Sequence, residues 1–492
     1  MKKFIISIDQ GTTSTRSILF DTAGRQVFIS QKELKQYFPK NGWVEHDPEE
    51  IWRKTNITLK EVISKSRNLG GKILTIGITN QRETTLVWDK QTGKCLYNAI
   101  VWQDRRTLNF CSSLKKKGLE KMIKFKTGLL LDPYFSSSKI KWIIDNVSPV
   151  KKLIKKNRIL FGTIDTFLIW KLTKGKLHAT DATNASRTML YNIKTNKWDK
   201  KILKIFKIPY KILPEIKNSA DDFGFTDKSV TKKSYSIRGV IGDQQAAAIG
   251  QGCFLKGSSK ITYGTGAFLI SNTGNKIIHS KNKLLSTVCY RINNKTTYAV
   301  EGSIYIAGAV IQWLRDNLKI ITSIKQSEII SKKLKSNNGV YFVPAFTGLG
   351  APYWNSEARG IITGLKRDTL QNDFVRAALE AVVYQSIDLF RALKNDGIKM
   401  SLIKVDGGMV QNNWFNQFLA DVSGLKVLRP HRQETTALGA ALIAGLGAGI
   451  FKSFSEIIKK NRIKRQFLPK INRKSRLKLL NGWHQAIRKT MK

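Results

Sequence analysis

The stretch FIISIDQGTTSTRSILF, residues 4–20, joins two β-prone runs through a turn rich in glycine and hydroxyl groups. The same layout returns about halfway along the chain as KITYGTGAFLI, residues 260–270. Backbone N–H groups and hydroxyls in a tight turn donate hydrogen bonds to a polyphosphate without needing side-chain bulk. Two such hairpins, one in each half of the chain, predict a nucleotide held between two related domains.

The length of the chain agrees with a division into two domains. A chain of 492 residues is too long to fold around one ordinary hydrophobic core. Its content of 41% apolar and 24% charged residues is typical of a globular protein. We place the domains at residues 1–252 and 253–492, so that each carries one hairpin.

The formal net charge of +50 raises nucleic-acid binding as an alternative function. The lysines are spread through nearly every segment, however, and no zinc finger, RNP-like strand or basic–aromatic stripe accompanies them. We therefore expect no specific nucleic-acid partner, although the charge fits weak adhesion to anionic surfaces.

An uncharged stretch, residues 435–451, consists mostly of Ala, Gly and Leu. It falls short of the roughly 18–20 strongly apolar residues that span a bilayer. We interpret it as a buried helix of small residues, whose glycines allow close packing, and expect no transmembrane segment. The four cysteines lie far apart without a CxxC pair, which argues against zinc or disulfides and for a reducing cytoplasm.

Short strands alternate with longer amphipathic stretches through both halves, which predicts α/β domains with ligands at strand ends. Beyond the hairpins, we expect strands at residues 73–79, 86–89, 96–102, 240–243 and 402–405. We expect helices at residues 162–171, 246–251, 304–317 and 373–394, and in the basic tail after Phe451. No Walker A sequence or protein-kinase glycine loop occurs, so ATP would need another architecture.

The first hairpin also carries charged groups. Asp9 ends a buried strand beside the phosphate turn, where a carboxylate can hold Mg²⁺ through water. Arg16 adds positive charge on the following strand. The alternative is an aspartate that caps an ordinary hairpin.

A polar insertion at residues 80–85 separates two apolar strands and contains Arg82 and Glu83. Adjacent donors and acceptors of this kind match vicinal hydroxyls. Trp102 and Tyr134 add rings that suit the C–H faces of a polyol or sugar. A surface turn with a solvated charge pair is the alternative.

Two strand ends complete the set of candidates. Asp243 follows Gly242 at the tip of a strand, where it can accept a hydroxyl proton during phosphoryl transfer, or simply cap the next helix. The turn at residues 406–408, followed by Asn412, has two glycines that let a ring or ribose approach the backbone.

These segments resemble the FGGY family of carbohydrate kinases, and within it the glycerol kinases, from residue 5 to residue 467. The motifs that carry the resemblance are residues 42–48 (GWVEHDP), 80–85 (NQRETT), 134–146, 344–354 (PAFTGLGAPYW) and 360–380. The resemblance implies two actin/hexokinase-like (ribonuclease H-like) domains with ATP in the cleft between them. It implies ATP-dependent phosphorylation of glycerol to sn-glycerol 3-phosphate, in glycerol uptake and catabolism, with Mg²⁺ near Asp9.

The resemblance also assigns roles to single residues. It assigns glycerol to Arg82, Glu83, Trp102, Tyr134, Asp243, Gln244 and Phe268. It assigns the nucleotide to Thr12, Thr13, Ser14, Arg16, Thr265, Gly308, Gln312, Gly408 and Asn412. Asp243 is the expected general base, with Asp9 and Arg16 as further catalytic groups.

The resemblance also implies that the protein forms a homodimer or homotetramer. Some members of the family are regulated by a bound metabolite or by a partner protein. A glycine-rich loop binds fructose 1,6-bisphosphate in some of them, but residues 226–235 contain no glycine here. A glutamate near the tail shares zinc with a partner in others, but residues 470–480 contain no acidic residue. We expect both controls to be lost. The alternatives are a kinase of another short polyol or ketose, and an actin- or chaperone-like nucleotide-gated binding protein.

Overall fold

The computed structural model describes residues 1–430, 434–454, 456 and 463–491. The first half is built on a five-stranded sheet of order β13-β5-β1-β2-β3. Its strands are β1 (Lys2–Gln10), β2 (Ser14–Asp21), β3 (Gln26–Glu33), β5 (Gly71–Asn80) and β13 (Ile237–Gly242). Strands β1, β2 and β3 are antiparallel, whereas β5 runs parallel to both β1 and β13.

The second half contains a seven-stranded sheet of order β16-β17-β15-β14-β20-β21-β22. Its strands are β14 (Ser259–Tyr263), β15 (Ala267–Gly274), β16 (Leu285–Ile292), β17 (Lys295–Ile304), β20 (Leu402–Asp406), β21 (Lys426–Pro430) and β22 (Ile463–Phe467). From β17 to β21 the pairing directions repeat those of the first sheet. The predicted repeat of the hairpin is confirmed and extends to a repeat of the whole sheet.

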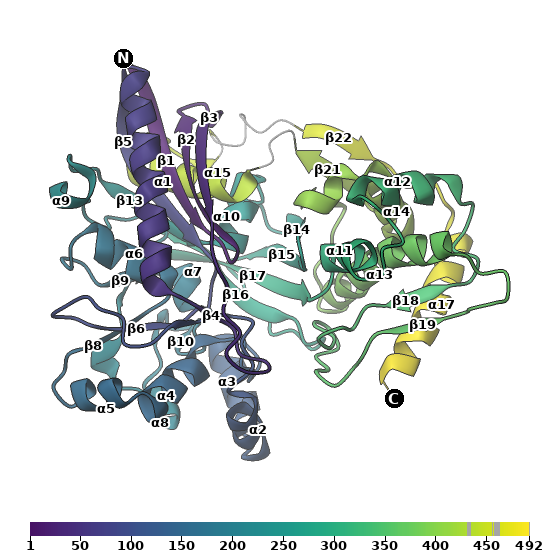
Figure 1. Cartoon of the computed structure of the whole chain (residues 1–492), viewed down its shortest axis with the longest axis horizontal. Coiled ribbons are helices and arrows are strands. Elements are labelled where there is room, and N and C mark those ends of the chain that lie inside the picture. The colour runs from purple at the N-terminus through teal and green to yellow at the C-terminus, as the bar shows by residue number, and fades with distance from the viewer. Residues whose placement is uncertain (431–433, 455, 457–462, 492) are drawn as a thin grey trace.

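Helices cover both faces of the first sheet. Helices α1 (Pro48–Asn68) and α6 (Ile164–Leu172) pack on one face, and α10 (Asp243–Gly250) with α15 (Thr435–Gly447) on the other. Although α15 comes late in the chain, Figure 1 shows it beside β1 and α10. A Cβ added to Gly77 would lie 2.3 Å from the Ala440 carbonyl oxygen, so the helix backbone lies directly on the strand. The predicted buried helix of small residues is confirmed.

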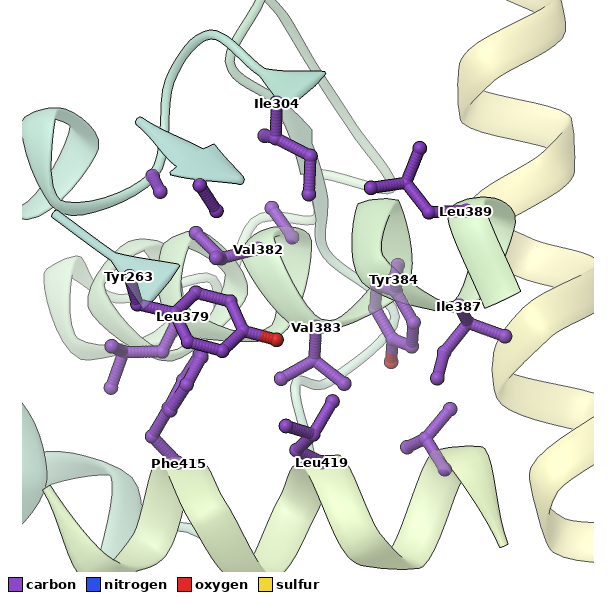
Figure 2. Close-up of a cluster of buried hydrophobic side chains, with 14 of the residues drawn as sticks. Tyr263, Ile304, Leu379, Val382, Val383, Tyr384, Ile387, Leu389, Phe415 and Leu419 are labelled. Atoms are coloured by element: carbon purple, nitrogen blue, oxygen red, sulfur yellow. The ribbon is translucent and has the colours of Figure 1, made fainter. Parts of the chain in front are cut away.

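The core of the second half lies around α13 (Gln371–Asn395). Figure 2 shows its residues Val383 and Leu379 facing Phe415 and Leu419 of α14 (Asn413–Ser423), while Ile304 of β17 approaches from the sheet side. Further helices of this half are α11 (Gly308–Asp316), α12 (Ile324–Lys333), η2 (Gly408–Gln411) and α17 (Arg473–Met491). A short pair, β18 (Tyr341–Val343) and β19 (Ile361–Thr363), lies beside α17.

Smaller elements lie between β3 and β13, and many of them share a third core with residues of β16 and β17. The helices are α2 (Leu108–Lys116), α3 (Glu120–Thr127), α4 (Ser136–Asn146), α5 (Ser148–Ile154), α7 (Ala182–Ala185), α8 (Lys200–Phe206), η1 (Tyr210–Ile212) and α9 (Lys228–Thr231). The strands are β4 (Glu45–His46), β6 (Leu86–Asp89), β7 (Ala99–Ile100), β8 (Ile159–Gly162), β9 (Ala179–Asp181), β10 (Tyr191–Asn192), β11 (Lys197–Trp198) and β12 (Glu215–Lys217).

Most predicted elements are confirmed, with four differences. The helix expected at residues 246–251 begins at Asp243, which was expected to end the preceding strand. The strand expected at residues 96–102 is only β7, two residues long. The helix expected from residue 304 begins at Gly308, because Ile304 still pairs with Ala267 in the sheet. The tail is not helical throughout, since β22 precedes α17; residues 455 and 457–462 of that tail lie outside the described part. Within the described ranges, no helix combines the length and the apolar character needed to cross a membrane.

Candidate active site

The first hairpin turn lies where β1 ends. The Gly11 N–H donates to the Ser14 carbonyl at 2.9 Å, which closes the turn and leaves Thr13 exposed. Asp9 is buried, and its Oδ2 lies 3.2 Å from Arg16 Nη2 across the strand pair. Burial raises the pKa of Asp9 even though the Arg16 guanidinium opposes this, and Asp9 in turn raises the pKa of Arg16.

The second turn is built from three segments of the other half. The N–H of Gly308, at the start of α11, donates to the Gly264 carbonyl at 2.9 Å. Gly407 has a φ of 93°, and a Cβ there would lie 2.3 Å from the Tyr263 carbonyl oxygen, so only glycine fits this turn. Thr265 and Gly408 are exposed at this edge. The structure therefore brings together the predicted nucleotide residues of β14, α11 and η2.

The other predicted nucleotide residues lie in the first turn, in α11 and at the N-cap of α14. Thr12 and Ser14 are half-buried in the first turn, and Gln312 is exposed one turn into α11. Asn412 begins α14, where its Oδ1 accepts a hydrogen bond from Phe415 N at 2.9 Å. Its side-chain oxygen is thereby committed to the helix, and its Nδ2 is the group left for a ligand.

Arg82 lies at the centre of the predicted polyol site. Its Nε is 3.1 Å from Asp243 Oδ1, and its Nη1 is 2.6 Å from Glu301 Oε1 and donates to Gln245 Oε1 at 3.1 Å. Arg82 is 3% exposed, so these contacts are made out of water. The alternative of a solvated surface turn is therefore wrong.

Glu83 is held as firmly as its neighbour. Its φ of 61° lies in the left-handed region, an uncommon state for a residue other than glycine. Thr85 Oγ1 and Ser136 Oγ each donate to its carbonyl oxygen at 3.0 Å, and Arg187 Nε lies 2.6 Å from its Oε1. Burial raises the pKa of Glu83, with the two neighbouring arginines acting against it.

Three aromatic rings border this polar group. Trp102 lies edge-on to Tyr134 and to Phe268, with ring centroids 5.5 and 5.9 Å apart. Its Nε1 donates to Thr12 Oγ1 at 3.0 Å. Trp102 thus touches the first turn on one side and β15, directly after the second turn, on the other.

Asp243 opens α10 with its side chain 30% exposed. Its Oδ1 accepts from Gln244 N at 2.6 Å. Burial raises the pKa of Asp243, while Arg82 and Lys260 oppose the shift. Lys260 Nζ donates to Gln244 Oε1 at 2.7 Å, which directs the oxygen of the Gln244 amide toward β14 of the second sheet.

Four charged residues at this site were not predicted from the sequence, namely Arg187, Lys260, Glu301 and Glu434. Glu301 and Lys260 stand as lone charges within apolar strands, which is a signal that could have been used. Glu434 pairs with Arg16, Nη1 to Oε2 at 2.7 Å, and has no comparable signal because its neighbours in the sequence, residues 431–436, are all polar or charged.

Asp9 suits a cation. Among the described residues its buried Oδ2 accepts no hydrogen bond, and its charged partner is the Arg16 guanidinium 3.2 Å away, so this oxygen next to the glycine turn still has lone pairs for a ligand. A hard divalent ion prefers such an oxygen, directly or through water. The residues present therefore fit Mg²⁺ at this position.

The repeated sheet, with a glycine turn from each half beside a cluster of buried polar side chains, defines a two-lobed phosphotransferase of the actin/hexokinase-like class. The models for the N-terminal and C-terminal domains of the FGGY family of carbohydrate kinases match residues 4–250 and 259–448. The chain belongs to the FGGY family of carbohydrate kinases.

Individual relatives cover the whole chain. It is 51% identical over 493 residues to a glycerol kinase of Coxiella burnetii, a match that covers 100% of this chain and 98% of that protein. It is 52% identical over 492 residues to a glycerol kinase of Clostridium botulinum, covering 100% and 99%. The crystal structure of Plasmodium falciparum glycerol kinase with ADP superimposes with a TM-score of 0.94 at 40% identity, covering 100% of this chain and 99% of that one. The resemblance predicted from the motifs is confirmed.

Proposed function

We propose that this protein is an ATP:glycerol 3-phosphotransferase, which transfers the γ-phosphoryl group of ATP to a terminal hydroxyl of glycerol. The observation that carries the proposal is the buried contact between Arg82 and Asp243, bordered by Trp102 and Tyr134 and lying between the two turns. Similarity over the full length to glycerol kinases supports the choice of glycerol among polyols.

In this proposal Arg82 and Glu83 orient two hydroxyls of glycerol, and the Gln244 amide donates to an oxygen. Asp243 accepts the proton of the attacking hydroxyl, since it is the accessible carboxylate of the group. The turns around Thr13 and Thr265 donate hydrogen bonds to the phosphates. Phosphoryl transfer needs little else from the protein, because positioning and electrostatic stabilisation supply most of the catalysis.

The test is ADP formation from Mg²⁺–ATP with and without glycerol, with xylulose and gluconate as controls. We expect ADP formation from Mg²⁺–ATP with glycerol and not with xylulose or gluconate. Equal turnover with xylulose or gluconate would favour a kinase of a broader or different substrate class. Slow hydrolysis that no polyol accelerates would instead favour a nucleotide-gated binding protein and contradict the proposal.

We also propose that Asp9 holds Mg²⁺, which when bound neutralises phosphate charge. Asp9→Asn should raise the Mg²⁺ concentration needed for half-maximal rate and lower kcat by about 10- to 100-fold, the usual range for a disturbed metal site. Asp21→Asn is the control, because Asp21 lies at the far end of β2 and its carboxylate already accepts hydrogen bonds from Ala23 N and Arg25 N. An unchanged Mg²⁺ dependence in Asp9→Asn would rule out the assignment.

A cytoplasmic location and a homodimer or homotetramer complete the proposal. Three of the four cysteines are buried and all are free thiols, which suits a reducing compartment. The oligomer rests on the resemblance to the family, and light scattering of the purified protein tests it.

A further inference from the structure

Glu301 is a carboxylate of the second sheet that lies beneath the polyol site of the first half. It belongs to β17, is 3% exposed, and pairs through the backbone with Leu285 on one side and Ile270 on the other. Because both neighbouring strands hold it, the backbone at this residue has little freedom. The position of Glu301 beside Arg82 is therefore set by the sheet.

Both oxygens of Glu301 are used. Its Oε1 lies 2.6 Å from Arg82 Nη1 and accepts from Gln245 Nε2 at 3.3 Å, and its Oε2 lies 3.3 Å from Arg187 Nη1. Burial alone would raise the pKa of Glu301, but Arg187 and Arg82 outweigh it, so the pKa is lowered and the group is ionised. The carboxylate therefore holds two arginines in place, and Arg187 in turn holds Glu83.

The contacts of Arg82 then decide which of its atoms faces a ligand. Nη1 is directed to Glu301 and Gln245, and Nε to Asp243. The planar guanidinium has a fixed fork of donors, so fixing two nitrogens also fixes the direction of Nη2. In the described part of the chain, Arg82 forms ion pairs with Asp243 and Glu301. Without Glu301, only Asp243 would remain of these two carboxylates, and the Arg82 guanidinium would be free to turn fully onto it.

We propose that Glu301 is a positioning residue for the polyol: it aims the Arg82 guanidinium at the substrate and keeps that guanidinium from engaging Asp243 with both ends. The inference rests on the proposed function. Glu301 does not itself contact the substrate. It acts on the polyol through Arg82, and on Glu83 through Arg187.

Glu301→Gln tests this by retaining the shape and removing the charge. The KM for glycerol should rise about ten-fold or more, as expected when a charged hydrogen-bond partner is lost, while the KM for ATP stays within about two-fold. Glu301→Asp restores the charge on a shorter arm and should recover part of the affinity for glycerol. A KM for glycerol equal to wild type in Glu301→Gln would overturn the proposal.

Glu380→Gln is the matched control. Glu380 is also buried and paired with an arginine, Arg376 Nε at 2.8 Å, but it lies in α13 within the second core, where it also contacts Tyr384 and Asn337. The Glu380→Gln substitution should lower the Tm and leave the KM values for glycerol and for ATP unchanged. If Glu380→Gln raised the KM for glycerol as much as Glu301→Gln did, Glu301 would be merely structural and the proposal would be wrong.

Two outcomes remain to be separated. If the wild-type protein shows no turnover that depends on glycerol, the proposed function fails before any variant is compared. If Glu301→Gln does not fold, Glu301→Asp decides: a higher KM for glycerol with an unchanged KM for ATP supports the proposal, and two unchanged values contradict it.

Discussion

Asp243→Asn is expected to lower kcat with glycerol by about 10²- to 10⁴-fold, the usual contribution of a general base. The substituted amide cannot accept the hydroxyl proton, yet it keeps the size of the side chain and an oxygen for the Gln244 N–H, which lies 2.6 Å from Asp243 Oδ1. The Tm should therefore shift by only a few degrees. Steady-state kinetics and thermal denaturation of the same preparation measure both quantities.

The control for this variant is Asp222→Asn. Asp222 is another carboxylate paired with an arginine, Arg238, but it is exposed and lies at the opposite end of β13 from Asp243. Its loss should leave kcat within about two-fold, as is usual for an exposed charge pair. A kcat of Asp243→Asn equal to wild type would exclude Asp243 as the base.

The pH dependence of kcat/KM is a second test of Asp243 as the general base. Because burial raises the pKa of Asp243, its protonated form persists to higher pH than for an ordinary aspartate. A base acts only when deprotonated, so kcat/KM of the wild-type enzyme should fall as the pH falls through this raised pKa.

Gly439→Ala is expected to lower the free energy of unfolding by about 3 kcal/mol or more, which is large for one methyl group. Gly439 lies within α15, where helix propensity alone would favour alanine by about 1 kcal/mol. The added Cβ, however, would lie 1.8 Å from the Ala246 carbonyl oxygen of α10. A backbone atom cannot rotate away as a side chain can, so α10 and α15 would have to separate.

Urea denaturation measures this effect, with Ala448→Ser at the exposed end of the same helix as the control. That substitution should change the free energy of unfolding by no more than about 0.5 kcal/mol. Since α10 begins at Asp243, separation of the two helices should also reduce activity. A Gly439→Ala protein as stable as wild type would show that the two helices can move apart freely.

The two glycine turns, and the chain segments that bear the candidate site, were predictable because their signals are local. A strand, a turn of glycine and hydroxyl residues, and a second strand are adjacent in sequence, and the same is true of Asp243 after its strand. Arg82, Glu83, Trp102 and Tyr134 were predicted as polyol ligands, and the structure places them together, although their roles stay predictions until they are tested.

The charge pairs that hold the site were not predictable in the same way. Arg82 and Glu301 are separated by 219 positions, and Arg16 and Glu434 by 418. No pattern of spacing connects such residues, because only the packing of the second half of the chain against the first brings them together. The same holds for α15, which lies in the second half of the chain but covers the first sheet.

Strand pairing, helix periodicity and turn chemistry depend on neighbours along the chain, so the repeated α/β design and the identity of the turns follow from the residues alone. The orientations of the Arg82 guanidinium and of the Gln244 amide, by contrast, depend on Glu301 and Lys260, which reach across from the other sheet. A buried charge must find its partner wherever the fold provides one, since desolvation leaves it no alternative. That choice is made only when the two halves pack together.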